Sequence, residues 1–108
     1  MNEAMKQKIE NGEVFLGIEL GSTRIKAVLI DNTYAPIASG GYNWENRLED
    51  GYWTYHLDDV WTGVQTSFRE LAKDVSERYG AALTKVASMG VSAMMHGYLA
   101  FDKEGNQL

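Results

Sequence analysis

Hydrophobic and polar positions in the first third of the chain predict three β-strands. Residues 14–20 form an almost continuous apolar run, which is typical of a strand buried on both faces. In a second predicted strand, 24–30, alternate apolar side chains fall on one face: Ile25, Ala27 and Leu29. A third strand is expected from Pro36 to Tyr42, after a turn at Asp31-Asn32. We therefore expect three consecutive antiparallel strands, with 24–30 in the middle.

The middle of the chain follows a helical period instead. Apolar residues recur at helical spacing at Val60, Val64, Phe68, Leu71, Val75 and Tyr79. This stripe predicts a helix over about 57–79 that packs on the core, with Gly80 as its C-terminal cap. The opposite, solvated face is expected to hold Gln65, Ser67, Arg69, Lys73 and Asp74.

The remaining segments complete a mixed α/β pattern. Residues 1–13 predict a short helical or frayed lead-in, with Asn11-Gly12 as a stop signal, and residues 44–55 predict an irregular loop. A fourth strand, 86–92, is expected to enter the sheet parallel to its neighbour. A fifth strand through Tyr98 and Phe101 would end in a turn over residues 102–106.

Composition excludes several classes of protein. The chain has 108 residues, 44% of them hydrophobic, and a net charge of −5, which disfavours a nucleic-acid or acidic-membrane surface. It has no cysteine, so thiol catalysis and zinc-thiolate sites are excluded. The sequence shows no secretory signal and no apolar run near the roughly 20 residues that span a bilayer. We expect a cytoplasmic protein.

The chemistry of the chain concentrates in the segment 14–31. Glu19 lies just before Gly21, which permits a tight turn and leaves space beside the backbone. Ser22, Thr23 and Lys26 then add hydroxyls, N–H donors and a positive charge. A carboxylate for metal-bound water and donors for phosphate are what a nucleotide requires. An ordinary β-hairpin is the structural alternative, and the segment is neither a P-loop nor a dinucleotide-binding fingerprint.

The run Gly17-Ile-Glu-Leu-Gly-Ser-Thr23 resembles the first phosphate-binding hairpin of the sugar kinase, actin and heat-shock ATPase superfamily. It is most similar to the FGGY carbohydrate kinases, where an Asp orders water around Mg²⁺. Here Glu19 replaces that Asp, Ser22 replaces a Thr, and Arg24 stands where a small residue is usual. The resemblance implies a ribonuclease-H-like α/β fold. It also implies phosphate contacts at Gly21, Ser22, Thr23 and Lys26, and a metal served through water by Glu19.

A second resemblance covers the run 92–97. Gly90-Val-Ser-Ala-Met-Met-His-Gly97 is similar to the Gly-x-Ser-x-Gln-Met-His-Gly/Ser run of xylulokinases and gluconokinases. There the Met-His pair touches the sugar, which implies that Met95 and His96 bind substrate here. Without the resemblance, a lone histidine is more often structural. Met94 replaces the usual Gln, and the Met-His pair implies a ketopentose or aldonate rather than glycerol.

Aromatic residues crowd the segment between the third strand and the helix: Trp44, Tyr52, Trp53 and Tyr55. They are candidates for stacking on a sugar, or they pack beneath their own loop. The run 51–61 resembles the family's Gly-Trp-x-Glu-x-Asp-Pro-x-x-x-Trp, with His56 in place of its Asp. That position marks the start of a helix, so His56 is interpreted as a helix-boundary residue.

The resemblance implies a part of an enzyme rather than a whole one. Residues 1–108 correspond to a partial N-terminal domain of a kinase that uses ATP and Mg²⁺. The family's general base is an Asp beyond Leu108, and neither Asp31 nor Asp102 takes its role. The isolated chain is therefore expected to be inactive, and the full-length enzyme is a possible homodimer. Two alternatives remain open: an actin-like or heat-shock-like nucleotide-binding module, and a stand-alone interaction domain.

Overall fold

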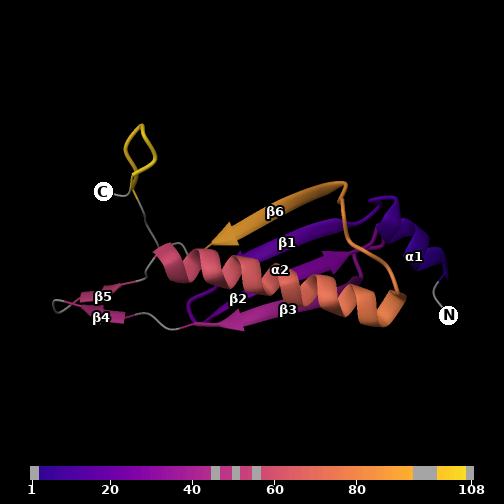
Figure 1. Ribbon diagram of the computed structural model, residues 1–108, viewed down its shortest axis with the longest axis horizontal. Helices are drawn as coiled ribbons and strands as arrows, with labels where there is room; N and C mark the ends of the chain where they lie inside the picture. Colours follow the sequence, from indigo (N-terminus) through magenta and orange to yellow (C-terminus); the bar gives the residue numbers. More distant parts are fainter. Residues whose placement is uncertain (1–2, 45–46, 50–51, 55–56, 94–99, 107–108) are drawn as a thin grey trace.

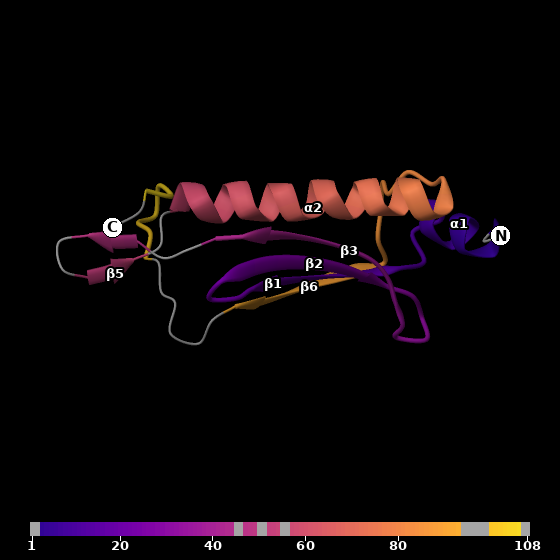
Figure 2. The same ribbon diagram turned by 90° about the horizontal axis from the view of Figure 1, so that it is seen from below.

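A computed structural model describes residues 3–44, 47–49, 52–54, 57–93 and 100–106. Its elements follow in the order α1 (Glu3–Glu10), β1 (Phe15–Leu20), β2 (Arg24–Ile30), β3 (Pro36–Asn43), β4 (Arg47–Glu49), β5 (Tyr52–Thr54), α2 (Leu57–Tyr79) and β6 (Ser88–Ala93). The main sheet has the strand order β3-β2-β1-β6, and α2 lies across one of its faces (Figures 1 and 2). β4 and β5 form a separate two-stranded sheet.

The order and direction of the main strands confirm the sequence prediction. β1, β2 and β3 are consecutive and antiparallel, with β2 in the middle. β6 pairs parallel to β1, as predicted for the strand that follows the helix. Parallel pairing requires a long crossover, and α2 supplies it by returning the chain across the sheet. The sheet is therefore mixed.

β1 is not buried on both faces, so that prediction was wrong. Leu16 and Ile18 are buried, whereas Gly17 and Glu19, on the opposite face, are exposed. Figure 2 shows the reason: α2 covers one face of the sheet, and no described helix covers the other. An apolar run predicts that both faces of the strand are buried, but here glycine and glutamate occupy the positions that face outward.

The predicted helix is confirmed as α2, but its buried stripe differs from the prediction. Ser67 is fully buried and Gly63 is buried, whereas Trp61 and Phe68 are exposed. Small residues face the sheet because α2 lies very close to β3. A Cβ atom on Gly40 of β3 would overlap backbone atoms of α2.

Hydrogen bonds complete this close contact between α2 and the sheet. The Ser67 hydroxyl donates to the carbonyl oxygen of Ile25 in β2 at 3.1 Å. Near the end of α2, the Tyr79 hydroxyl donates to the carbonyl oxygen of Ile37 in β3 at 2.9 Å. Buried polar groups need such partners to offset the loss of water. The serine therefore belongs to the core and not to the solvated face.

The helix ends agree with the turn signals in the sequence. α1 buries Ile9 completely, and Gly12 follows with φ +75°. After α2, Gly80 has φ +64°, and its N–H donates to the Ser76 carbonyl at 2.9 Å. Glycine adopts this left-handed conformation without steric cost, which explains both positions.

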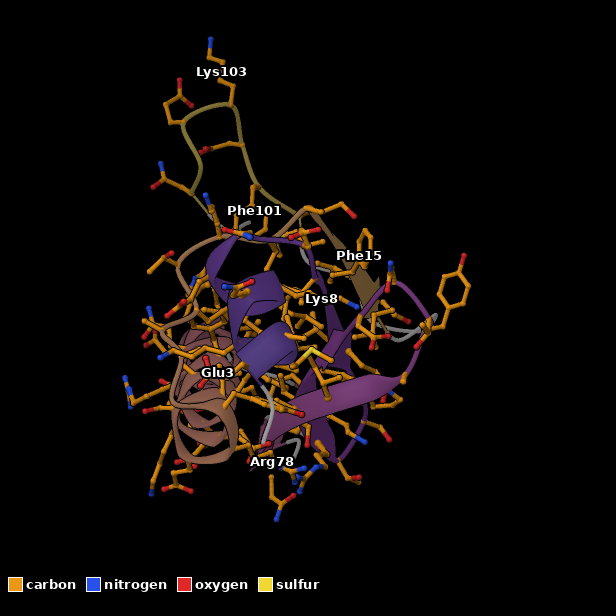
Figure 3. All side chains as sticks on the ribbon, turned by 90° about the vertical axis from the view of Figure 1, so that its right-hand side faces the viewer. Glu3, Lys8, Phe15, Arg78, Phe101 and Lys103 are labelled. Carbon is orange, nitrogen blue, oxygen red and sulfur yellow. The ribbon has the colours of Figure 1, made fainter. Side chains whose placement is uncertain are left out.

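Two further segments can be compared with the prediction. Residues 44–55 were expected to be irregular, but β4 and β5 pair there as a short hairpin. The predicted turn over residues 102–106 is confirmed by a bond from the Gly105 N–H to the Asp102 carbonyl at 3.0 Å. Lys103 stands at its tip, away from the sheet (Figure 3). Of the predicted fifth strand, Tyr98 lies outside the described residues, and no strand is found at Ala100 and Phe101, so that part of the prediction was wrong.

The turn between β2 and β3 is organised by one buried carboxylate. Asp31 Oδ1 accepts bonds from the Thr33 N–H at 2.8 Å and the Thr33 hydroxyl at 2.6 Å. The Ala35 N–H donates to the same oxygen at 3.3 Å. The bond from the Thr33 side chain, followed by the backbone bonds, lowers the pKa of Asp31 below its usual 3.8. The ionised form is therefore favoured by folding.

This lowered pKa predicts an acid-sensitive contribution to stability. Because the folded pKa lies below the unfolded one, the contribution is complete above pH 3.8 and is lost as the pH falls through the folded value. We expect Asp31→Asn to reduce the free energy of unfolding at pH 7 and to approach the wild type at low pH. Urea unfolding across pH 2–7 measures this, with the exposed Glu10→Gln as control. If the free energies of unfolding of Asp31→Asn and the wild type differ by the same amount at every pH, the prediction is contradicted.

Candidate functional site

A hollow of about 550 Å³ lies over β1, β2 and β6 and reaches the uncovered face of the sheet. Gly17 of β1 and Gly90 of β6 are neighbours in the strand register. A Cβ atom on either glycine would meet nothing within 4 Å. The absence of side chains at both positions leaves the strands' backbone accessible. A ligand can therefore approach the sheet closely here.

Three polar side chains form a row across this hollow. Glu19 of β1 lies opposite Lys26 of β2 in the antiparallel register, and opposite Ser92 of β6 in the parallel register. All three residues line the hollow. Side chains directly opposite on neighbouring strands are about 4.5–5.5 Å apart at Cβ. The fold thus brings a carboxylate and an ammonium group of the hairpin together with a hydroxyl from a distant part of the sequence.

This row joins the two predicted motifs. Glu19 and Lys26 belong to the predicted phosphate hairpin, and Ser92 begins the predicted sugar-contact run 92–97. The sequence alone does not connect the two motifs, because spacing along the chain does not give the register between β1 and β6. Met95 and His96 follow Ser92 closely in the sequence, but they lie outside the described residues. Their predicted contact with a sugar stays a prediction.

The hairpin turn, residues 21–23, connects β1 to β2 and requires its glycine. The Gly21 N–H donates to the Arg24 carbonyl at 2.9 Å, and a Cβ atom on Gly21 would lie 2.8 Å from the same oxygen. Ser22 and Thr23 are exposed at the tip of the turn. The predicted tight turn at Gly21 is therefore present, and the two residues that carry hydroxyls lie outside the core.

Arg24 follows the turn but does not join the row. Its Nη1 donates to Asn43 Oδ1 at 2.8 Å, and its guanidinium occupies the space that a side chain on Gly41 would fill. Arg24 lines a second hollow, of about 500 Å³, beside β3 and α2. The bulky residue at this position is therefore directed toward β3, whereas Lys26 lines the first hollow.

Trp44 contacts the hairpin turn and is buried. Its backbone N–H donates to the Thr23 carbonyl at 3.1 Å, and its indole Nε1–H donates to the Gly21 carbonyl at 2.8 Å. Trp44 is therefore buried, but against the hairpin turn and not beneath its own loop. The sequence carries no signal for these contacts. The side chains of Tyr52, Trp53, Tyr55 and His56 lie outside the described residues.

The donors at the hollow fit one kind of metal site. Among the described residues, no group of three or more His, Cys, Asp or Glu side chains could hold a metal ion. A single carboxylate beside an open hollow suits Mg²⁺, which keeps several waters and takes further oxygens from substrate phosphates. Glu19 is the carboxylate among the residues that line the hollow, and it could hold such an ion through water. In the described part of the chain, no helix has the length and apolar character to cross a bilayer.

Comparisons with known proteins assign this arrangement to a family. The family model for the N-terminal domain of the FGGY family of carbohydrate kinases matches residues 14–108. A comparison with curated proteins found no match.

Three solved structures share the fold. A xyloylose kinase from Brucella ovis superimposes with a TM-score of 0.70 at 21% identity, over 87% of this chain and 19% of its own. A gluconate kinase from Lactobacillus acidophilus gives 0.68 at 20% identity, over 88% and 18%. A xylulose kinase from the same species gives 0.65 at 21% identity, over 88% and 18%. The chain therefore spans less than a fifth of each structure.

Proposed function

Because the chain belongs to the FGGY family of carbohydrate kinases, we propose that it is the N-terminal part of an ATP-dependent sugar kinase. The reaction is transfer of the γ-phosphoryl group of ATP to a hydroxyl of a small carbohydrate. The observation that carries this proposal is the row formed by Glu19, Lys26 and Ser92 over a glycine-floored hollow. It combines groups for metal-bound water, phosphate and a hydroxylated substrate at one place.

Each residue of the hairpin has a distinct part in this proposal. Gly21, Ser22 and Thr23 bind phosphate oxygens through N–H and hydroxyl donors, and Lys26 adds a positive charge. Glu19 holds Mg²⁺ through water. When bound, Mg²⁺ neutralises part of the phosphate charge. The chain's own contribution is to fix the phosphates in place, which lowers the entropic part of the barrier.

The sugar is bound, in this proposal, by Met95 and His96 beyond the end of β6. An imidazole can donate to or accept from a sugar hydroxyl. Ser92 supports this location, because it precedes both residues and already lines the hollow with Glu19. The solved structures of xylulose and gluconate kinases share this fold and support a ketopentose or an aldonate as substrate.

We further propose that residues 1–108 are one part of a larger ribonuclease-H-like domain. The strand order β3-β2-β1-β6 supports it, as do the exposed apolar side chains of Met89 and Val91 on β6, which α2 does not cover. The general base and the adenosine pocket then lie beyond Leu108. The isolated chain has no phosphoryl-transfer activity, and the full-length enzyme is cytoplasmic, with a homodimer as a possible assembly.

Neutralising Lys26 tests the phosphate site directly. We expect Lys26→Met to weaken binding of Mg·ATP by roughly tenfold, because one charge-assisted contact with phosphate is lost. Isothermal titration or ³¹P NMR of the full-length protein measures the affinity. Lys103→Met is the matched control, since it makes the same change on an exposed turn away from the hollow (Figure 3). It should bind like the wild type.

The outcomes separate the proposed function from its alternatives. Equal affinity in both variants would remove Lys26 from the site. Mg·ATP binding without phosphorylation of any ketose or aldonate by the full-length protein would favour a nucleotide-binding module. No binding of Mg·ATP by either the chain or the full-length protein would favour an interaction domain in which the hairpin is structural.

A further inference from the structure

Trp44 donates hydrogen bonds to two backbone carbonyl groups of the hairpin turn. It directly follows β3, and only 6% of its surface is exposed. Its indole Nε1–H donates to the Gly21 carbonyl at 2.8 Å, and its backbone N–H donates to the Thr23 carbonyl at 3.1 Å. Both accepting carbonyls belong to the turn that carries Ser22 between them. A residue 21 positions beyond Thr23 and 23 positions beyond Gly21 therefore restrains both ends of the turn.

These two bonds set the direction of the turn's dipoles. A trans peptide is planar, and its C=O and N–H groups point in opposite directions. When the Gly21 carbonyl points toward Trp44, the Ser22 N–H points away from it. Carbonyl oxygens carry partial negative charge and repel phosphate, whereas N–H groups attract it. Holding the carbonyls on the Trp44 side therefore prepares the other side for an anion.

The environment of Trp44 makes this restraint effective. A hydrogen bond removed from water exchanges less readily with solvent and is electrostatically stronger than an exposed one. The glycine that the turn needs also makes its backbone intrinsically mobile. The turn's own bond runs from the Gly21 N–H to the Arg24 carbonyl and does not involve the carbonyl oxygens of Gly21 and Thr23. A bulky, buried donor can supply the remaining restraint.

From this geometry we infer that Trp44 is a positioning residue for phosphate: it orients the hairpin turn without touching the ligand. This inference rests on the proposed function, because it assumes that the turn binds phosphate. It replaces the idea that Trp44 stacks on a sugar. It also links the segment after β3 to the phosphate site, since any shift of Trp44 moves the carbonyls of Gly21 and Thr23.

The test removes the indole N–H donor and keeps an aromatic ring at this position. Trp44→Phe retains the backbone N–H and most of the buried aromatic surface but removes Nε1–H. The matched control is Trp61→Phe, the same change on α2 at a residue that is 56% exposed. Amide hydrogen exchange in the 108-residue chain is measured by NMR, and the Mg·ATP affinity of the full-length protein is measured by titration. Assignment of the indole signals follows from the two variants.

Three results are expected. Exchange of the Gly21 amide becomes about tenfold faster in Trp44→Phe, and Mg·ATP binding becomes about five- to tenfold weaker, which corresponds to one lost hydrogen bond. The exchange rates of amides in the centre of α2 do not change in Trp44→Phe. The urea midpoint of Trp61→Phe equals that of the wild type. In the wild type, the Trp44 indole N–H signal shifts on addition of Mg·ATP, whereas the Trp61 signal does not.

The contrary results are distinguishable. If wild type and Trp44→Phe bind Mg·ATP equally, Trp44 is only structural and the inference is overturned, while the proposed function stands. Unchanged exchange at Gly21 overturns the inference in the same way. If the full-length wild type binds no Mg·ATP, the proposed phosphate site fails, and the positioning role fails with it. If Trp44→Phe does not fold, the inference is overturned unless the indole signal of the wild type shifts with Mg·ATP.

Discussion

Gly40→Ala is expected to destabilise the chain by roughly 3 kcal/mol or more, because the new methyl group has no space. A Cβ atom at this position would overlap the Ser67 carbonyl oxygen and the Leu71 nitrogen, which are backbone atoms of α2. Backbone atoms cannot swing aside as a flexible side chain can. The helix must therefore move away from β3, and its buried side chains Leu71 and Val75 would lose contacts with the core. Stability of small domains is only about 5–15 kcal/mol, so the loss is large.

Urea unfolding followed by circular dichroism measures this effect. Gly90→Ala is the matched control, because it makes the same change in the same sheet at a position where a Cβ atom meets nothing within 4 Å. We expect Gly90→Ala to match or slightly exceed the wild type, by up to about 1 kcal/mol, through reduced freedom of the unfolded chain. Equal stability of Gly40→Ala and Gly90→Ala would show that α2 does not lie this close to β3.

His96→Ala in the full-length kinase is expected to reduce kcat/KM for the sugar by roughly 10- to 100-fold. The loss of a side chain that hydrogen-bonds a sugar hydroxyl leaves a polar group of the substrate unpaired, which costs about 1–3 kcal/mol. The KM for ATP should not change, because the proposed phosphate contacts come from the hairpin turn and Lys26. Steady-state kinetics with ketoses and aldonates, at saturating ATP, measures the effect.

The second histidine of the chain provides the control. His56 precedes α2 and is interpreted as a helix-boundary residue, so His56→Ala should leave kcat/KM for the sugar close to the wild-type value. If His96→Ala phosphorylates sugars as well as the wild type does, His96 does not belong to the substrate site. A proportional loss with both sugar and ATP would instead point to a general loss of folded enzyme, which circular dichroism would detect.

The sequence by itself determined most of the secondary structure. Strand β2 and helix α2 were predictable because side chains alternate with period 2 in a half-buried strand and recur with period 3.6 in a helix. Strand β1 was indicated by its apolar run, although that run did not give its burial. The ends of α1 and α2 were predictable because Gly12 and Gly80 adopt positive φ values that other residues avoid. The chemical groups of the hairpin turn were also evident from Glu19 to Lys26, since they lie close together along the chain.

Tertiary structure alone decided which surfaces are covered and which groups meet. Burial of Ser67 follows from the close approach of α2 to Gly40, which no local pattern encodes. The row of Glu19, Lys26 and Ser92 depends on the register between β1 and β6, and the bonds from Trp44 to the hairpin turn join separate strands. Such contacts depend on how the elements pack, and packing is a property of the whole fold rather than of any one segment.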